Sequence, residues 1–87
     1  MPTVFVPPLM RALTHELERV EVSGTNVRQV LEALEAQYPG IKARLCLGEE
    51  LRPGMAVAVD GNMSSLGLRQ KLLPTSEVHF LPAIGGG

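Results

Sequence analysis

The feature that most constrains the fold of this chain is one amphipathic stretch near its middle, over residues 26–38. Its apolar residues recur at steps of three and four, which places them on one side of an α-helix. Pro39 and Gly40 follow and end the helix, because both residue types interrupt helical structure. A helix with a single apolar side must cover another layer of structure. The apolar positions are Val27, Val30, Leu31, Leu34 and Tyr38.

Four segments around this helix have the composition of β-strands. Residues 3–6 form a β-branched and aromatic run before two prolines, and residues 17–22 end in an alternation of apolar and charged side chains. Residues 55–59 and 77–82 repeat such patterns after the helix. The order strand, strand, helix, strand, strand predicts a two-layer α+β domain. We expect a β-grasp (ubiquitin-like) fold, with a mixed sheet of four or five strands and one main helix across it.

The connecting segments carry weaker patterns. Residues 9–16 and 48–54 are expected to be loops, and residues 41–46 are expected to add one further helical turn. A short edge strand is expected near residues 66–68. Thr25 is expected to cap the main helix, because its hydroxyl can accept a hydrogen bond from a free amide at the helix start.

Size and charge limit the classes of function. A chain of 87 residues holds one domain, which we place at residues 1–84, followed by a flexible tail at 85–87. The net charge is −1, and its eight basic and nine acidic side chains form no basic cluster, so nucleic-acid binding is not expected. No apolar run is long enough to span a membrane. The single cysteine, Cys46, fits a reducing compartment, and a cytoplasmic location is expected.

Side chains suited to catalysis or metal binding are few. The two histidines, His15 and His79, lie far apart in the sequence, and with one cysteine they do not make up a metal site. Cys46 has apolar neighbours on both sides and is interpreted as a half-buried structural thiol rather than as a nucleophile. We therefore expect no catalytic residue, no metal and no stably bound cofactor.

The remaining unusual feature is the end of the sequence, Gly85-Gly86-Gly87. A frayed terminus or an expression-vector remnant are the simplest interpretations, but no other vector residues accompany the glycines. Without Cβ atoms, such a tail can pass through a narrow channel of a partner and leave its carboxylate open to attack. A glycine tail directly after an ordered strand therefore has a physical use.

This tail, together with the segments before it, resembles the ThiS/MoaD family of sulfur carriers. That family includes the small subunit of molybdopterin synthase, the thiamine-pathway carrier and the carrier that feeds a cysteine synthase. The resemblance extends over nearly the whole chain. Residues 78–84 followed by the terminal glycine pair are the most specific part, and residues 31–41 and 57–61 are similar to the family's helix and central strand. Gly85 departs from the family pattern, in which a different small residue is common, and thiamine-pathway carriers are typically shorter.

The resemblance implies a mechanism centred on Gly87. A partner enzyme would use ATP to adenylate the carboxylate of Gly87, and a persulfide sulfur would displace AMP to leave a thiocarboxylate. Gly85 and Gly86 would provide reach. The protein would then be a carrier substrate or a non-catalytic synthase subunit, not an enzyme. The expected partners are an adenylating, sulfurtransferase-type enzyme and a sulfur-accepting synthase, and a metalloprotease or a sulfur donor is a further candidate.

The resemblance leaves several functions open. The sulfur could serve cysteine biosynthesis, molybdenum cofactor (molybdopterin) biosynthesis or a sulfur-containing natural product. One alternative is a ubiquitin-like modifier that is conjugated to other proteins through Gly87. A second alternative is a β-grasp interaction module that carries no sulfur.

Partner docking requires a surface near the tail. Successive side chains of a strand point to opposite faces of the sheet. If the valines of residues 55–59 point into the core, and Val78 and Phe80 do the same, the residues between them point outward. We expect an exposed apolar patch that leads to the tail, unless Leu81 is only a scattered exposed residue. The candidate docking residues are Leu81, Ala58, Ala56, Ile84 and Pro82.

Overall fold

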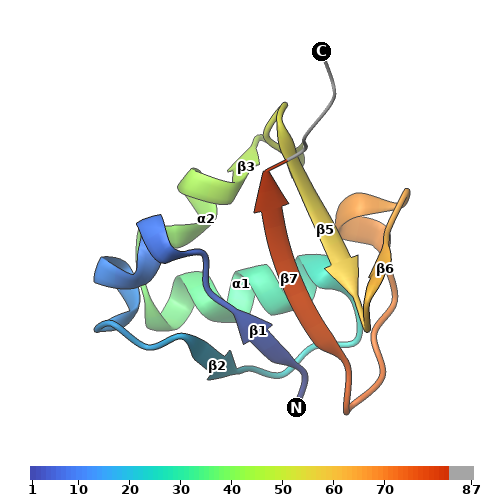
Figure 1. Cartoon of the computed structure of the whole chain (residues 1–87), viewed down its shortest axis with the longest axis horizontal. Coiled ribbons are helices and arrows are strands. Elements are labelled where there is room, and N and C mark those ends of the chain that lie inside the picture. The colour runs from blue at the N-terminus through green and yellow to red at the C-terminus, as the bar shows by residue number, and fades with distance from the viewer. Residues whose placement is uncertain (83–87) are drawn as a thin grey trace.

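Five strands form the main sheet of this computed structural model, which describes residues 1–82. The last strand of the chain, β7, lies at the centre of the sheet, parallel to β1 and antiparallel to β5 (Figure 1). The order across the sheet is β2-β1-β7-β5-β6, so the predicted mixed sheet is confirmed. The strand bounds are β1 (Thr3–Phe5), β2 (Arg19–Glu21), β5 (Met55–Val59), β6 (Asn62–Met63) and β7 (Glu77–Pro82).

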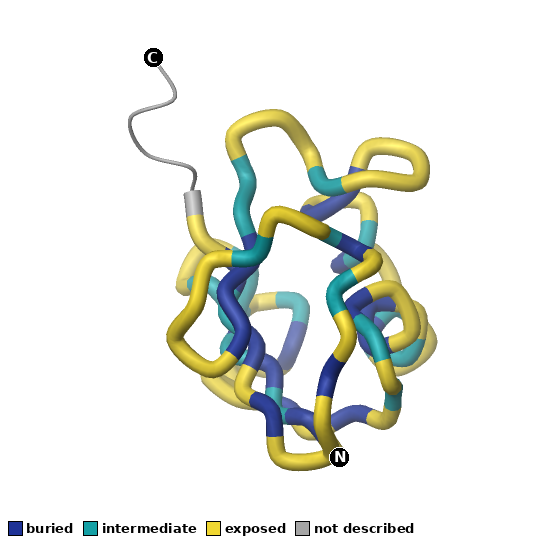
Figure 2. The backbone as a smooth tube through the Cα atoms, turned by 90° about the vertical axis from the view of Figure 1, so that its right-hand side faces the viewer, coloured by how far each residue is buried: buried dark blue, intermediate teal, exposed yellow. Residues whose placement is uncertain are grey.

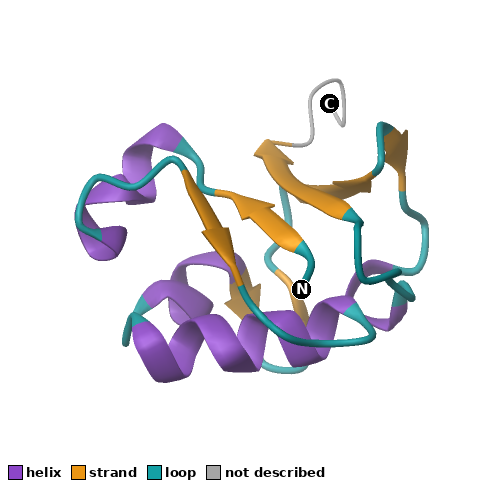
Figure 3. Cartoon of the chain, turned by 90° about the horizontal axis from the view of Figure 1, so that it is seen from below, coloured by secondary structure: helices purple, strands orange, loops and turns teal. Residues whose placement is uncertain are grey.

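The predicted main helix is α1 (Val27–Gln37), which crosses one face of the sheet (Figure 3). The four apolar residues within it are fully buried, and Tyr38 follows as its half-buried C-cap. The expected cap was wrong, because Asn26 and not Thr25 occupies the N-cap. The Asn26 side-chain oxygen accepts a hydrogen bond of 2.8 Å from the backbone amide of Gln29. Thr25 instead donates to the side chain of Gln29 from its amide and its hydroxyl.

The core fills the space between α1 and the inner face of the sheet. Val78 and Phe80 of β7 and Val57 of β5 point toward the helix and are buried, as the alternation predicted. Figure 2 shows the buried stretches inside the molecule and the exposed turns around them. The two-layer arrangement of a mixed sheet and one long helix is the β-grasp fold. The predicted tail at residues 85–87 and the end of the predicted domain, residues 83–84, lie outside the described residues.

The connection between β1 and β2 differs from the expected loop. It contains a 3-10 helix, η1 (Pro8–Thr14). Its geometry is fixed at both ends, because Pro8 can occupy a first helical position and the buried hydroxyl of Thr14 lies 3.2 Å from the carbonyl of Arg11 and 3.0 Å from that of Leu17. A 3-10 helix has three residues per turn, so it leaves no α-helical period in the sequence.

The second half of the chain holds two further differences. The expected loop at residues 48–54 is partly a hairpin of β3 (Cys46–Leu47) and β4 (Glu50–Leu51), which follows the short helix α2 (Ile41–Leu45). The helix α2 confirms the helical turn that was predicted at residues 41–46. The edge strand is β6 rather than residues 66–68, because the Asp60-Gly61 turn pairs β6 with β5 at once. The 3-10 helix η2 (Gly67–Arg69) takes the expected place of the edge strand.

The described helices also bear on membrane insertion. Within residues 1–82, no helix combines the length and the apolar character that crossing a membrane requires.

Candidate functional site

The sheet face opposite α1 changes character along β7. At the start of the strand, the exposed Glu77 pairs with Thr3 of β1, which pairs in turn with Glu21 of β2. At the end of the strand, Leu81 pairs with Ala56 of β5. The outer face is therefore acidic where β7 begins and apolar where the chain leaves the sheet toward residues 83–87.

One row of side chains crosses this face through all five strands. Phe5 and His79 stack in its middle with ring centroids 4.1 Å apart and an angle of 8° between the rings. The guanidinium carbon of Arg19 lies 6.0 Å from the centre of the Phe5 ring, within the range of a cation–π contact. The stacked rings give the outer face a flat aromatic platform. The full row is Arg19, Phe5, His79, Ala58 and Met63.

The predicted docking residues differ in how much of each side chain is exposed. Leu81 is 38% exposed and Ala56 is half-buried, and the two are neighbours on the outer face. Ala58 points outward as predicted, yet it is only 7% exposed, so the expectation that it forms open surface was wrong. It is covered because its small side chain lies between those of His79 and Met63 on the adjacent strands. Pro82 is the last residue of β7.

The rest of the predicted site lies beyond the described part of the chain. Ile84, Gly85, Gly86 and Gly87 all fall there. The structure therefore defines the surface from which the tail departs. The docking role of these residues stays a prediction.

A mostly apolar groove of about 610 Å³ opens beside the end of β7. One wall consists of residues 7–10, which we call the lip. The opposite wall consists of side chains from the end of β7 and the start of β5. The groove was not predicted from the sequence, because its walls are far apart in the chain. The available signal was the apolar pair Leu9-Met10 directly after two prolines. The wall residues other than the lip include Met55, Phe80 and Leu81.

The lip has a fixed backbone and an unusual side chain at its crest. The amide of Met10 donates to the carbonyl of Pro7 at 2.9 Å, and Met10 packs against the core. Behind the lip, the Arg11 side chain donates to the carbonyl of Val6 at 3.2 Å and lies 3.9 Å from the carboxylate of Glu18. Leu9 is nevertheless 93% exposed. A large apolar side chain is thus held out in water by an ordered segment.

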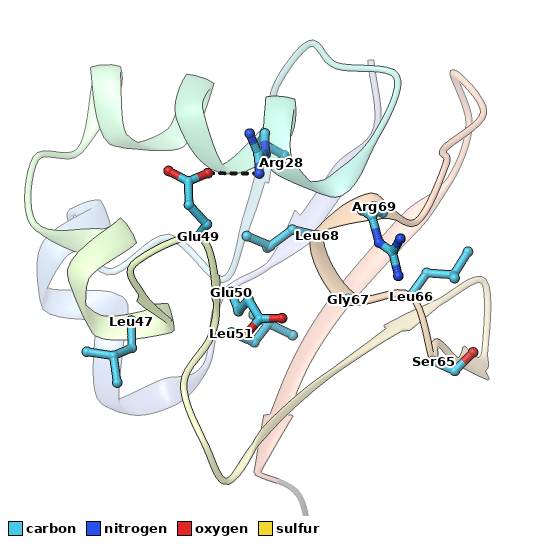
Figure 4. A pocket seen from close by; sticks show the side chains of 10 residues that line it. All are labelled: Arg28, Leu47, Glu49, Glu50, Leu51, Ser65, Leu66, Gly67, Leu68 and Arg69. Atoms are coloured by element: carbon cyan, nitrogen blue, oxygen red, sulfur yellow. Dashed lines mark ion pairs between the residues drawn. The ribbon is translucent and has the colours of Figure 1, made fainter.

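A second cavity, of about 670 Å³, has a mixed lining (Figure 4). Arg28 of α1 and Glu49 of the β3–β4 turn form an ion pair of 2.8 Å at its margin. Glu50 and Arg69 contribute one further charge of each sign. This cavity offers balanced charges and no single chemical class of ligand.

Cys46 and His15 occupy structural positions in the described chain. Cys46 is 5% exposed, and burial raises the pKa of its thiol, which leaves it protonated and weakly nucleophilic at neutral pH. His15 ends η1 and contacts Tyr38 edge-on at 5.9 Å between ring centroids. Residues 1–82 contain no group of three or more histidine, cysteine, aspartate or glutamate side chains placed to hold a metal ion.

Comparison with known proteins gives matches over the full length of the chain. The ThiS family pattern matches residues 4–87. A chain in the crystal structure of the Amycolatopsis orientalis BexX/CysO complex is 30% identical, with complete coverage of both chains and a TM-score of 0.90. CysO of Mycobacterium tuberculosis is 29% identical over 97% of this chain and 100% of its own, with a TM-score of 0.88. No curated protein matches the sequence.

A further solved structure extends the likeness to a protein named as a modifier. Small archaeal modifier protein 1 of Methanosarcina acetivorans is 25% identical over 99% of this chain and 95% of its own, with a TM-score of 0.78. These matches confirm the β-grasp fold that the element order predicted.

Proposed function

The chain belongs to the ThiS family, and on this basis we propose that it is a sulfur carrier whose reactive group is the C-terminal carboxylate of Gly87. The observation that carries the proposal is the extent of the family match, which continues past the last strand to residue 87. The matched region therefore includes the glycine tail. The apolar outer face at the end of β7 supports the proposal, because a partner that receives the tail must contact this surface.

The proposed chemistry converts a poor electrophile into an activated acyl group. A carboxylate oxygen of Gly87 attacks the α-phosphorus of ATP in the partner enzyme, which forms an acyl adenylate and releases pyrophosphate. A persulfide sulfur then attacks the acyl carbon and expels AMP. A thiol cleaves the resulting sulfur–sulfur bond, so the thiol is oxidised to a disulfide and the thiocarboxylate is released on Gly87. The ATP is a substrate of the partner, and the chain itself is the substrate that carries sulfur.

The tail length defines where the partner must bind. Five residues follow Pro82, and a fully extended chain of that length spans at most about 17 Å. The nucleotide of the partner must therefore come within this distance of the end of β7. The partner then contacts the surface around that end, which includes Leu81 and Ala56. A sulfur-accepting synthase must meet the same requirement, so we propose that the two enzymes bind in turn.

The decisive experiment follows sulfur onto the terminal acyl group. The chain is incubated with an adenylating enzyme of its own organism, ATP and a sulfur donor, and intact mass spectrometry detects the exchange of one oxygen for sulfur. Deletion of Gly86 and Gly87 is expected to abolish this exchange. Cys46→Ser is expected to leave it intact, because the sulfur is carried by the acyl group and not by a thiol. Sulfur on the truncated chain, or on Cys46, would overturn the proposal.

A second candidate function is conjugation to other proteins through Gly87. It is favoured by the 25% identity to small archaeal modifier protein 1 over almost the whole chain. The test uses Ala83→Arg, which lets trypsin leave an Ile-Gly-Gly-Gly remnant on any modified lysine. Remnant-bearing target peptides in cells that express the variant would support conjugation. If they are missing while the thiocarboxylate is present, conjugation is ruled out. If the tail proves dispensable for the protein's function, the chain is instead an interaction module.

A further inference from the structure

We propose that the groove beside β7 and its lip form the surface by which the adenylating partner distinguishes this chain from other small β-grasp proteins. Leu9 inserts into an apolar pocket of the partner, and the groove receives an apolar side chain of the partner in return. A carboxylate of the partner meets Arg19. This inference rests on the proposed function, since it assigns the occupant of a surface next to the reactive tail.

The position of the groove identifies its occupant. Phe80 and Leu81, the two residues before the end of β7, form part of its wall. Because the tail reaches at most about 17 Å, a partner that holds Gly87 in its active site must also cover the region around Pro82. The groove opens in that region. The adenylating enzyme therefore covers the groove for as long as it holds the tail.

The lip is suited to selective recognition. Its backbone is held by the hydrogen bond from Met10 to Pro7 and by the prolines themselves, so little conformational entropy remains to be lost on binding. Leu9 projects from it with 93% of its surface exposed. An apolar side chain presented on a rigid segment and buried at the centre of an interface typically contributes strongly to affinity.

The charges around the groove add a second element of recognition. Three charged side chains line it: Arg11, Glu18 and Arg19. The side chain of Arg11 lies 3.9 Å from the carboxylate of Glu18. Arg19 lies over the Phe5 ring and has no ion pair within residues 1–82. The rim therefore presents one uncompensated positive charge. A carboxylate on the partner is the complementary group.

The test measures ATP–pyrophosphate exchange by the adenylating enzyme as the concentration of the full chain is varied. Leu9→Asp is expected to raise the KM for the chain at least about tenfold with kcat unchanged. Leu73→Asp is the matched control, because Leu73 is 66% exposed and does not line the groove. It should leave KM unchanged. Leu9→Met, which keeps an apolar side chain, should remain close to the original KM, and equal melting temperatures confirm that all variants are folded.

A second pair of variants tests the charge of Arg19 alone. Arg19→Gln is expected to reduce the dependence of kcat/KM on ionic strength, since screening acts on the removed pair. Arg69→Gln, an exposed arginine that lines the other cavity, should keep the original dependence. Equal salt dependence for both variants would overturn the role of Arg19.

The outcomes separate this inference from the carrier proposal. Normal exchange by Leu9→Asp, together with loss of exchange on deletion of Gly86 and Gly87, would overturn the groove assignment and leave the carrier proposal standing. Equal loss in the Leu9 and Leu73 variants would also overturn it. No exchange by the unmodified chain would overturn the carrier proposal and this inference with it.

Discussion

At the scale of single residues, alternation along β7 separates side chains that hold the fold from those available to partners. Val78 and Phe80 point toward α1 and are buried, while His79 and Leu81 point to the outer face. Substitutions of inward residues should therefore act on stability, and substitutions of outward residues on recognition. The two properties can be tested one at a time.

Leu34 is the residue through which the fold can be tested most directly. It is fully buried in α1, so Leu34→Ala removes apolar contacts and leaves a cavity, which costs about 2–5 kcal/mol. Urea unfolding followed by circular dichroism measures the loss. Leu73→Ala, at an exposed position, should change stability by less than about 0.5 kcal/mol. A loss below about 1 kcal/mol for Leu34→Ala would contradict the described packing.

Leu81 tests recognition without disturbing the fold. Leu81→Glu places a carboxylate on the apolar end of the outer face, where partner contact would remove it from water without a counter-charge. We expect binding to the adenylating enzyme, measured by titration calorimetry, to weaken at least about tenfold. The melting temperature should stay unchanged. Leu66→Glu, at another exposed leucine outside this face, is the control, and equal weakening by both variants would argue against docking at Leu81.

At the scale of elements, segment length decided what the sequence could predict. α1, β5 and β7 contain enough residues for a repeating apolar pattern, and their positions and inward faces followed from that pattern. The hairpin strands β3 and β4 have two residues each, too few for any period. They are held by pairing with each other, and the hydrogen bond from the Arg52 amide to the Leu45 carbonyl extends that pairing.

In the candidate site, too, the sequence could predict only what a pattern within one strand determines. The outward direction of Leu81 and Ala56 could be predicted from alternation within one strand. The covering of Ala58 could not, because it depends on side chains from the strands on either side. The groove likewise required knowledge of how residues 7–10 pack beside the end of β7.

Glu35 joins two elements through its charge. Its carboxylate accepts hydrogen bonds from the backbone amides of Gly40, at 3.0 Å, and Lys42, at 2.9 Å, at the start of α2. These two bonds lower the pKa of Glu35 below the ordinary glutamate value. Gly40 has a φ of 102°, which glycine adopts readily, so the chain can turn sharply between the helices.

This shift predicts a pH-dependent contribution to stability. A carboxyl group whose pKa is lower in the folded state stabilises the protein above its unfolded pKa, and this contribution is lost as the pH falls through the folded value. Glu35→Gln should therefore lower the free energy of unfolding at neutral pH. The difference from the original chain should disappear at a pH below the folded-state pKa of Glu35, where the carboxyl group is protonated in both states. Urea titrations at the two pH values measure it, and a difference that is the same at both would contradict the role of the charge.

At the scale of the whole molecule, the strand that leads to the tail lies at the centre of the sheet. β7 is hydrogen-bonded to β1 on one side and to β5 on the other (Figure 1). β1 comes from the opposite end of the chain, so the parallel pairing of β1 with β7 joins the first and last strands in one sheet. A partner that binds the tail therefore acts on the centre of the sheet rather than on an edge. Changes to the chain after Pro82, where the described strand ends, should therefore affect carrier function without affecting folding stability.

That separation gives the last prediction. Deletion of Gly86 and Gly87 should change the free energy of unfolding by less than about 0.5 kcal/mol, because the described core lies within residues 1–82. In the free protein, we expect fast hydrogen exchange for the amides of Gly85 and Gly86 in nuclear magnetic resonance spectra, since ordering three glycines costs much entropy. Protected amides at these positions, or a marked loss of stability on deletion, would mean that the tail is part of the fold. Loss of sulfur transfer on deletion would then no longer identify Gly87 as the reacting residue.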